Sequence, residues 1–425
     1  RGARSRPFYF TRAGVRRDLA IVVSPKKALD VNLYEVNPAI VEATADTEAG
    51  RSTFRDLWLA NTDRPDSVNL EHFANLGVNM LWLQPIHPIG VEARGLDPAT
   101  SAPYEPGSPY AVRDYWQVAP SLGAANTEAG ALAEFQTAVA RFDEAGIGVM
   151  MDGTFNHSAP DAVLGQGAVD LFPWAASAGT QIRSQRPQWY SKEGNFLLPA
   201  STSAEVVVAP YRSDFGKWTD VRDFFFGNYD ALVKYASPSH QEEYLLERDA
   251  LEPLASDTRE LWEYFAHYPS YWLAKTGHPA GTPASQSYKG IDGLRCDFAQ
   301  GLPSEFWEYC INKTRSVKWD FLFMAESLDG YREAAGSKRH GVGYRSARHF
   351  DILNENIVFH WRDTHFGYPA TGEGSGGSGD RSTARTYEAF DNRRQADEGV
   401  VILNNLTSHD EVFPSNNSYE LLQAY

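Results

Sequence analysis

Short apolar segments alternate with longer amphipathic segments along most of this chain, and this alternation limits the folds that the chain can adopt. Apolar runs of strand length, followed by segments of helical periodicity, are typical of parallel βα units. The predicted strands are residues 31–36, 78–83, 147–155, 291–298, 321–326, 349–358 and 400–406. The predicted helices are residues 67–76, 132–145, 257–274 and 304–312. The pattern predicts an α/β protein with the (β/α)8 TIM-barrel fold.

A stretch of about a hundred residues after the third predicted strand breaks this alternation. Residues 158–256 are rich in aromatic residues, proline and glycine and show no clear βα period. Because a structureless loop of that length is unusual in a compact domain, we expect an inserted subdomain there. The expected parts are an N-terminal arm (1–30), a first barrel part (31–157), the inserted subdomain (158–256) and a second barrel part (257–425).

The predicted strands fall one short of a closed eight-stranded barrel. Only fifteen residues follow Asp410, which is too few for another βα unit. An open parallel edge would expose unpaired backbone groups. We therefore expect the last βα unit to be missing from this chain, and the alternative is that a segment such as residues 18–23 supplies the strand.

Charge and hydropathy narrow the classes of partner. The formal net charge of -16 at pH 7 disfavours nucleic acid and other polyanions, so a neutral substrate fits better. No apolar run approaches the roughly 20 residues of a membrane-spanning helix, and the first residues lack the apolar core of a signal peptide. The two cysteines form no disulfide framework, and Cys296 is expected to point outward under the helix layer. The compartment and the oligomeric state do not follow from these features.

Acidic residues stand at the C-terminal ends of four predicted strands, namely Asp152, Asp297, Glu326 and Asp410. The C-terminal ends of parallel barrel strands meet at one mouth, where the βα loops build a cleft. Because side chains alternate along a strand, Arg295 and Asp297 should face the same interior. One acidic residue at a strand end is usually a helix cap or turn residue. Four together, accompanied by an arginine, indicate a catalytic site.

A pair of carboxyl groups can cleave a glycosidic bond. One stays protonated and gives a proton to the leaving oxygen, while the other stays ionised and attacks the anomeric carbon. A neighbouring cation lowers the pKa of an acid, so Arg295 is expected to keep Asp297 ionised. A third carboxylate can stabilise the positive charge that develops in the transition state.

Four motifs then resemble the ordered signature regions of the α-amylase superfamily, glycoside hydrolase family 13. They are DGTFNH at 152–157, GLRCDFA at 293–299, MAE at 324–326 and SHD at 408–410. The PYAVRDY segment at 109–115 is similar to a further element of that family, and the insertion after the third strand matches its extra subdomain. Ser408 departs from the usual Asn. Gln300 and Gly301 replace the Lys-His of many endo-acting amylases, which disfavours ordinary starch endo-hydrolysis.

The resemblance implies that Asp297 is the nucleophile, Glu326 the general acid/base and Asp410 the stabiliser of the transition state. The residues that it implies around the reacting sugar are Tyr110, Asp152, His157, Arg295 and His409. Asn156 resembles a position that binds calcium in many members, and the alternative is a hydrogen-bonded loop amide. No cofactor is implied for the chemistry itself, so the calcium would be structural.

The predicted function is that of a retaining glycoside hydrolase, which acts on α-linked glucans or oligosaccharides through a covalent glycosyl-Asp297 intermediate. The alternative is a transglycosylase or an isomerising enzyme with the same double displacement, because acceptor choice depends on loops. A metal-dependent hydrolase is disfavoured, since its candidate ligands lack the usual close spacing; they would be Asp152, His157, Glu326 and His409. An inert binding protein is disfavoured because the carboxylate trio is complete.

Overall fold

The computed structural model describes part of the chain in full. These residues are 23–45, 47–60, 64–190, 219–226, 254–284, 288–299, 302, 304–326, 350–354, 401–403 and 409, of which 48, 304, 305 and 402 are described by their backbone alone, together with the backbone of the short strands 10–12, 15–17, 196–198 and 206–208.

Seven parallel strands form one sheet whose order, from one edge to the other, is the order of the chain. They are β3 (Leu33–Val36), β4 (Met80–Leu83), β5 (Gly148–Gly153), β10 (Gly293–Cys296), β11 (Leu322–Glu326), β12 (Ile352–Asn354) and β13 (Val401–Leu403). Each strand lies inside a segment that was predicted to be a strand. A parallel sheet wound strand by strand is the arrangement of a (β/α) barrel, so the predicted fold class is confirmed.

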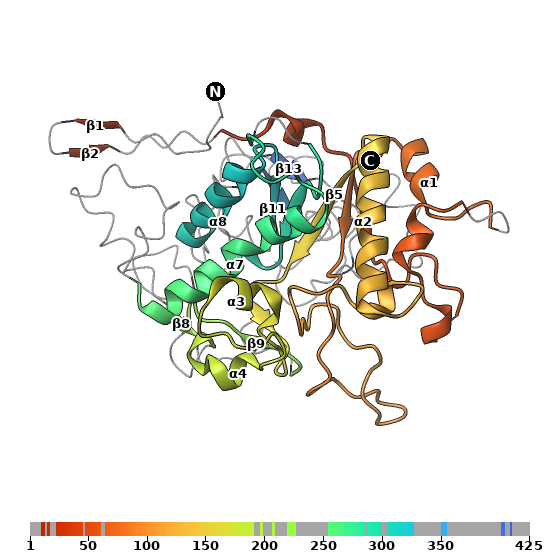
Figure 1. Cartoon of the computed structure of the whole chain (residues 1–425), viewed down its shortest axis with the longest axis horizontal. Coiled ribbons are helices and arrows are strands. Elements are labelled where there is room, and N and C mark those ends of the chain that lie inside the picture. The colour runs from red at the N-terminus through yellow and green to blue at the C-terminus, as the bar shows by residue number, and fades with distance from the viewer. Residues whose placement is uncertain are drawn as a thin grey trace, which may run out of the picture.

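The four predicted helices are present as α1 (Leu70–Asn75), α2 (Glu128–Ala145), α7 (Ser256–Lys275) and α8 (Ser304–Val317). In Figure 1, α1 and α2 lie to the right of the central strands, and α7 and α8 lie to the left. Helix α2 begins earlier than predicted because the Thr127 side chain accepts the Gly130 N–H at 3.2 Å. It ends at Gly146, whose φ of 75° is the left-handed conformation that glycine adopts without strain.

In the part of the segment after β5 that the structure describes, short helices and antiparallel strands stand in place of βα units. They are β6 (His157–Ser158), α3 (Gly165–Leu171), α4 (Ile182–Gln185), β7 (Phe196–Leu198), β8 (Val206–Val208) and β9 (Arg222–Asp223). β6 pairs with β9, and β7 pairs with β8. The remaining short elements are β1 (Phe10–Arg12), β2 (Val15–Arg17) and the 3-10 helices Lys26–Asp30, Glu48–Gly50, Phe54–Leu57, Pro120–Leu122 and Pro187–Trp189. The domain boundaries stay a prediction.

Alternating side chains of the strands separate two layers of the core. The inner layer fills the space enclosed by the sheet with residues that include Met80, Met150, Met324 and Ile352. The outer layer, between the sheet and the helices, contains Cys296 and Cys310, which are both buried free thiols. The outward direction expected for Cys296 is therefore confirmed. No helix in the described part of the chain has the length and apolar character needed to cross a membrane.

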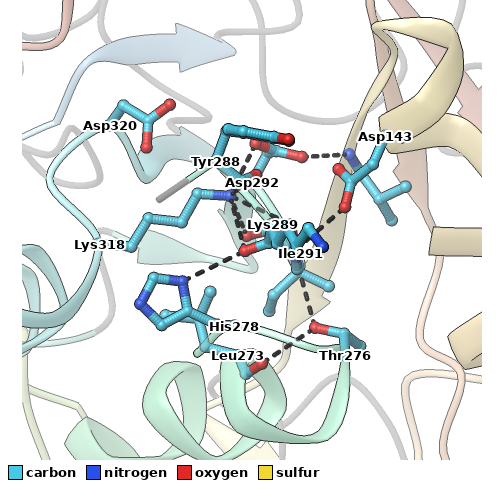
Figure 2. A network of polar contacts seen from close by, with 12 residues as sticks. Asp143, Leu273, Thr276, His278, Tyr288, Lys289, Ile291, Asp292, Lys318 and Asp320 are labelled. Atoms are coloured by element: carbon cyan, nitrogen blue, oxygen red, sulfur yellow. Dashed lines mark hydrogen bonds and ion pairs between the residues drawn. The ribbon is translucent and has the colours of Figure 1, made fainter. Parts of the chain in front are cut away.

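A buried polar network holds the N-terminal ends of the strands (Figure 2). The Lys318 ammonium, which follows α8, lies 2.9 Å from Asp292 Oδ1 and 2.9–3.1 Å from the carbonyl oxygens of Tyr288, Gly290 and Ile291. Lys27 joins Asp292 at 3.2 Å and Asp320 at 3.1 Å. This network ties the loop before β10 to the base of the barrel, at the end away from the candidate site.

Candidate active site

The register of the sheet brings the acidic strand ends together. Asp152 on β5 lies directly opposite Arg295 on β10, and Arg295 lies opposite Met324, two residues before Glu326 on β11. Two-residue alternation turns Arg295 and Glu326 to the same interior. None of Asp152, Arg295, Asp297 and Glu326 is more than 6% exposed, so the four form one desolvated cluster.

The guanidinium of Arg295 connects the three acids. Its Nη1 donates to Asp297 Oδ1 at 2.6 Å and lies 3.2 and 3.3 Å from the two oxygens of Asp152. Its Nη2 lies 2.9 Å from Glu326 Oε2. Because the guanidinium is a small planar fork, the carboxyl groups of Asp297 and Glu326 are held on two neighbouring nitrogens of one group.

A backbone donor contacts the same oxygen of Glu326 as Arg295 does. The Phe298 N–H donates to Glu326 Oε2 at 2.6 Å. Phe298 has a φ of 44°, a left-handed conformation that is uncommon for a bulky residue. The residue that follows the expected nucleophile is therefore held in an unusual backbone conformation while its N–H contacts the expected acid/base, an arrangement often found at functional sites.

The pKa of Asp297 is shifted in the direction opposite to the one expected from Arg295 alone. Burial raises the pKa of Asp297 well above its usual range; Arg295 lowers it, and the charges of Glu326 and Asp152 raise it again. Burial likewise raises the pKa of Asp152 to about 6 against the opposing charge of Arg295. Arg295 lowers the pKa of Asp297, as expected, but this effect does not offset burial together with the charges of two other acids, so the net shift is upward.

Two aromatic side chains position Asp152. Its Oδ2 accepts the indole N–H of Trp82 at 3.0 Å and the hydroxyl of Tyr110 at 3.1 Å. The guanidinium of Arg295 lies over both rings, 4.9 Å from the centre of Trp82 and 5.8 Å from that of Tyr110. Tyr110 thus belongs to the cluster through its hydroxyl group as well as through its ring.

The two predicted histidines, His157 and His409, have different surroundings. His157 is fully buried, with Nε2 3.1 Å from the carbonyl oxygen of Tyr110, and burial lowers its pKa to about 4. His409 stacks on Tyr110 with ring centres 5.1 Å apart and planes at 13°, and it meets the edge of Trp82 at 5.7 Å. The structure thus brings His409 next to Asp152, whereas His157 supports the backbone of Tyr110.

Some predicted positions lie outside the described residues, namely Asp410, Ser408, Gln300 and Gly301. The role of Asp410 therefore stays a prediction. Its neighbour His409 is described and lies at the cluster, which is the position expected of this motif. Asn156 is buried, and its Oδ1 has no hydrogen-bond partner in the described part of the chain.

Two residues of this site were not predicted from the sequence. Glu35 near the end of β3 and Trp82 near the end of β4 lie directly opposite each other in the register of the sheet. Trp82 contacts Asp152, and Glu35 contacts His409 at 2.5 Å. An acidic residue in an otherwise apolar predicted strand was the available signal for Glu35, and its position two residues after Leu33 places it on the inner face.

Comparison with known proteins agrees with this architecture, although no family model matches the chain. The α-1,4-glucan:maltose-1-phosphate maltosyltransferase of Arcanobacterium haemolyticum is 28% identical over 177 residues, which is 41% of this chain and 22% of that protein. The enzyme of the same name from Chlorobaculum tepidum is 28% identical over 345 residues, 78% of this chain and 38% of that protein. An α-amylase from Lactobacillus plantarum has a TM-score of 0.54 at 22% identity, covering 91% of this chain and 64% of the solved chain.

The described residues define a parallel (β/α) barrel whose strands end in a buried cluster of acids around one arginine. The solved α-amylase shares this fold, and the curated relatives match the sequence at 28% identity, in agreement with the resemblance to the α-amylase superfamily. The chain spans between 22% and 38% of the length of the curated relatives that it matches.

Proposed function

We propose that this chain forms the catalytic barrel of a retaining enzyme that acts on α-linked glucans by double displacement. The observation that supports the proposal most strongly is the placement of Asp297 and Glu326 on neighbouring nitrogens of the Arg295 guanidinium. A retaining pair needs two carboxyl groups close together, one protonated and one ionised. A buried cluster of three acids around one cation suits that division of roles, because burial disfavours ionisation of all three acids together.

In the proposed reaction, an oxygen of Asp297 attacks the anomeric carbon while Glu326 gives its proton to the departing oxygen. The glycosyl group is then bound to Asp297, and Glu326 carries the negative charge. An incoming hydroxyl group gives its proton to Glu326 and attacks the same carbon, which restores both carboxyl groups and the original configuration. Arg295 stays bound to both acids, and Asp152 balances part of its charge.

Water as the incoming hydroxyl gives hydrolysis, and a sugar hydroxyl gives transfer. The curated relatives favour transfer as the second candidate function, because each is named a maltosyltransferase that uses maltose 1-phosphate and α-1,4-glucan. In that reaction the departing oxygen would belong to phosphate, and the roles of Asp297 and Glu326 would be unchanged.

One experiment separates these outcomes. The protein is incubated with maltohexaose alone and with maltohexaose plus maltose 1-phosphate, and the products are separated by chromatography. Shorter chains in the first mixture support hydrolysis. Chains longer by two glucose units, with release of phosphate in the second mixture, support maltosyl transfer. Unchanged substrate in both mixtures, and with pullulan, trehalose and sucrose, would contradict the proposal.

Calcium binding is a separate proposal. The buried Oδ1 of Asn156, which has no hydrogen-bond partner among the described residues, could act as a ligand. However, no group of three or more His, Cys, Asp or Glu in the described part of the chain could hold a metal ion. We therefore assign no catalytic step to calcium. A melting temperature that falls on chelation in the wild type but not in Asn156→Ala would support the site.

A further inference from the structure

A further carboxylate lies beside the cluster. Glu35 on β3 accepts a hydrogen bond from Gln84 Nε2 at 2.9 Å, and its Oε1 lies 2.5 Å from His409 Nδ1. Gln84 is held in turn by Asn37, whose amide donates to Gln84 Oε1 at 2.8 Å. Glu35 is therefore held by Gln84, which follows β4, and it also contacts His409, which is 374 positions away in the chain.

The surroundings of Glu35 favour its charged form. Burial alone would raise the pKa of Glu35, but the hydrogen bond and charge of His409, the Gln84 amide and the charge of Arg295 together hold it below the ordinary value of 4.5. An ionised carboxylate accepts hydrogen bonds and donates none. The contact with His409 therefore requires a proton on the Nδ1 atom of the imidazole.

His409 has little freedom left once this contact is made. Its ring is stacked on Tyr110 and bordered by the edge of Trp82, and both of these side chains are bound to Asp152. These ring contacts set the plane of the imidazole, and the contact with Glu35 sets its rotation within that plane. The side chain of His409 keeps 20% of its surface exposed, so a ligand at the cluster can reach it.

We propose that Glu35 is a positioning residue that fixes the ring orientation and tautomer of His409, so that Nε2 is directed to a hydroxyl group of the reacting sugar. A carboxylate that holds one nitrogen of a histidine determines what the other nitrogen offers to a ligand, as it does in metal sites. This inference rests on the proposed function. Glu35 itself contacts no reacting atom and acts through His409.

A double-mutant cycle tests the inference. The variants are Glu35→Ala, Glu35→Gln, His409→Ala and the double alanine variant, with Glu144→Gln on the exposed face of α2 as a matched control. Loss of such an orienting contact typically costs about 10–100-fold in activity. We expect Glu35→Ala to lower kcat by that factor, and Glu35→Gln, which keeps an acceptor oxygen, to lower it less. In the His409→Ala background, Glu35→Ala should lower kcat by less than about 2-fold, because the group on which it acts is gone.

Equal losses in both backgrounds would overturn the inference, because Glu35 would then act without His409. The inference would also be overturned if Glu35→Gln lowered kcat as much as Glu35→Ala and both variants had a lower urea midpoint. That result would show a purely structural role for Glu35. The control variant should keep the wild-type kcat.

A second measurement does not depend on activity. In nitrogen-15 NMR spectra of the wild type, the imidazole of His409 should be protonated at Nδ1 and hydrogen-bonded, and Glu35→Ala should remove that hydrogen-bonded signal. An unchanged signal in Glu35→Ala overturns the inference. If the wild type cleaves or transfers no glucan while the NMR signal behaves as expected, the proposed function fails and the contact between Glu35 and His409 stands.

Discussion

Replacing Lys318 with Met should destabilise the fold far more than replacing its partly exposed neighbour Lys27. Lys318 is fully buried, and its ammonium lies within 3.1 Å of three backbone carbonyl oxygens and Asp292 Oδ1. Methionine keeps the apolar stem but leaves these oxygens without their donor. Hydrogen bonds to a charged group contribute about 1.5–3 kcal/mol each, and removing one partner of a buried ion pair costs about 3–5 kcal/mol. We expect a loss of about 3–5 kcal/mol in the free energy of unfolding.

Urea unfolding followed by tryptophan fluorescence measures this loss, and Lys27→Met is the matched control. Lys27 pairs with the same Asp292, but about a third of its side chain is exposed, so its loss should be about 0–1 kcal/mol. A midpoint for Lys318→Met no lower than that of Lys27→Met would refute the reasoning. The buried ammonium of Lys318 would then contribute nothing measurable to the free energy of unfolding.

Three further predictions concern the cluster and the buried acids. Arg295→Lys should lower kcat at least about 100-fold in steady-state assays, because a lysine cannot hold two carboxyl groups on a planar fork; wild-type turnover would contradict this. Trp82→Phe removes the indole donor to Asp152 and should cost about 1–3 kcal/mol in urea unfolding, and an unchanged midpoint would contradict it. Burial raises the folded-state pKa of Asp114 from 3.8 to about 6, so its contribution to stability is present below pH 3.8 and is lost as the pH rises through 6. Between pH 4 and pH 8, the free energy of unfolding of Asp114→Asn should therefore rise relative to that of the wild type by on the order of 2 kcal/mol. A difference in stability that does not change with pH would contradict a role for the raised pKa of Asp114.

The strands were predictable because their physical signal is local. A strand that is buried on both faces has a short apolar run in its sequence. Glycines such as Gly146 indicate where the preceding helix ends. The convergence of Arg295, Asp297 and Glu326 was also predictable, because the alternation of side chains and the shared mouth of a barrel leave few other arrangements.

Other features depend on contacts that no local pattern encodes. The partner of Glu35 is 374 residues away, and only the register of β3 against β4 reveals that Glu35 and Trp82 are neighbours. The pKa of Asp297 depends on burial and on the combined charge of its neighbours, so counting one adjacent arginine led to the wrong direction. The insertion could be recognised because the alternation of strands and helices stops there. Its short antiparallel strand pairs could not be predicted from the sequence.

The central claim is that Asp297 carries the glycosyl group during the reaction. Mass spectrometry of the protein after incubation with a fluorinated glucosyl fluoride, whose covalent intermediate breaks down slowly, tests it directly. The account predicts a protein heavier by one fluoroglucosyl unit, with the added mass on the peptide that contains Asp297. An adduct on a different residue, or unmodified protein together with a product of inverted configuration, would contradict it.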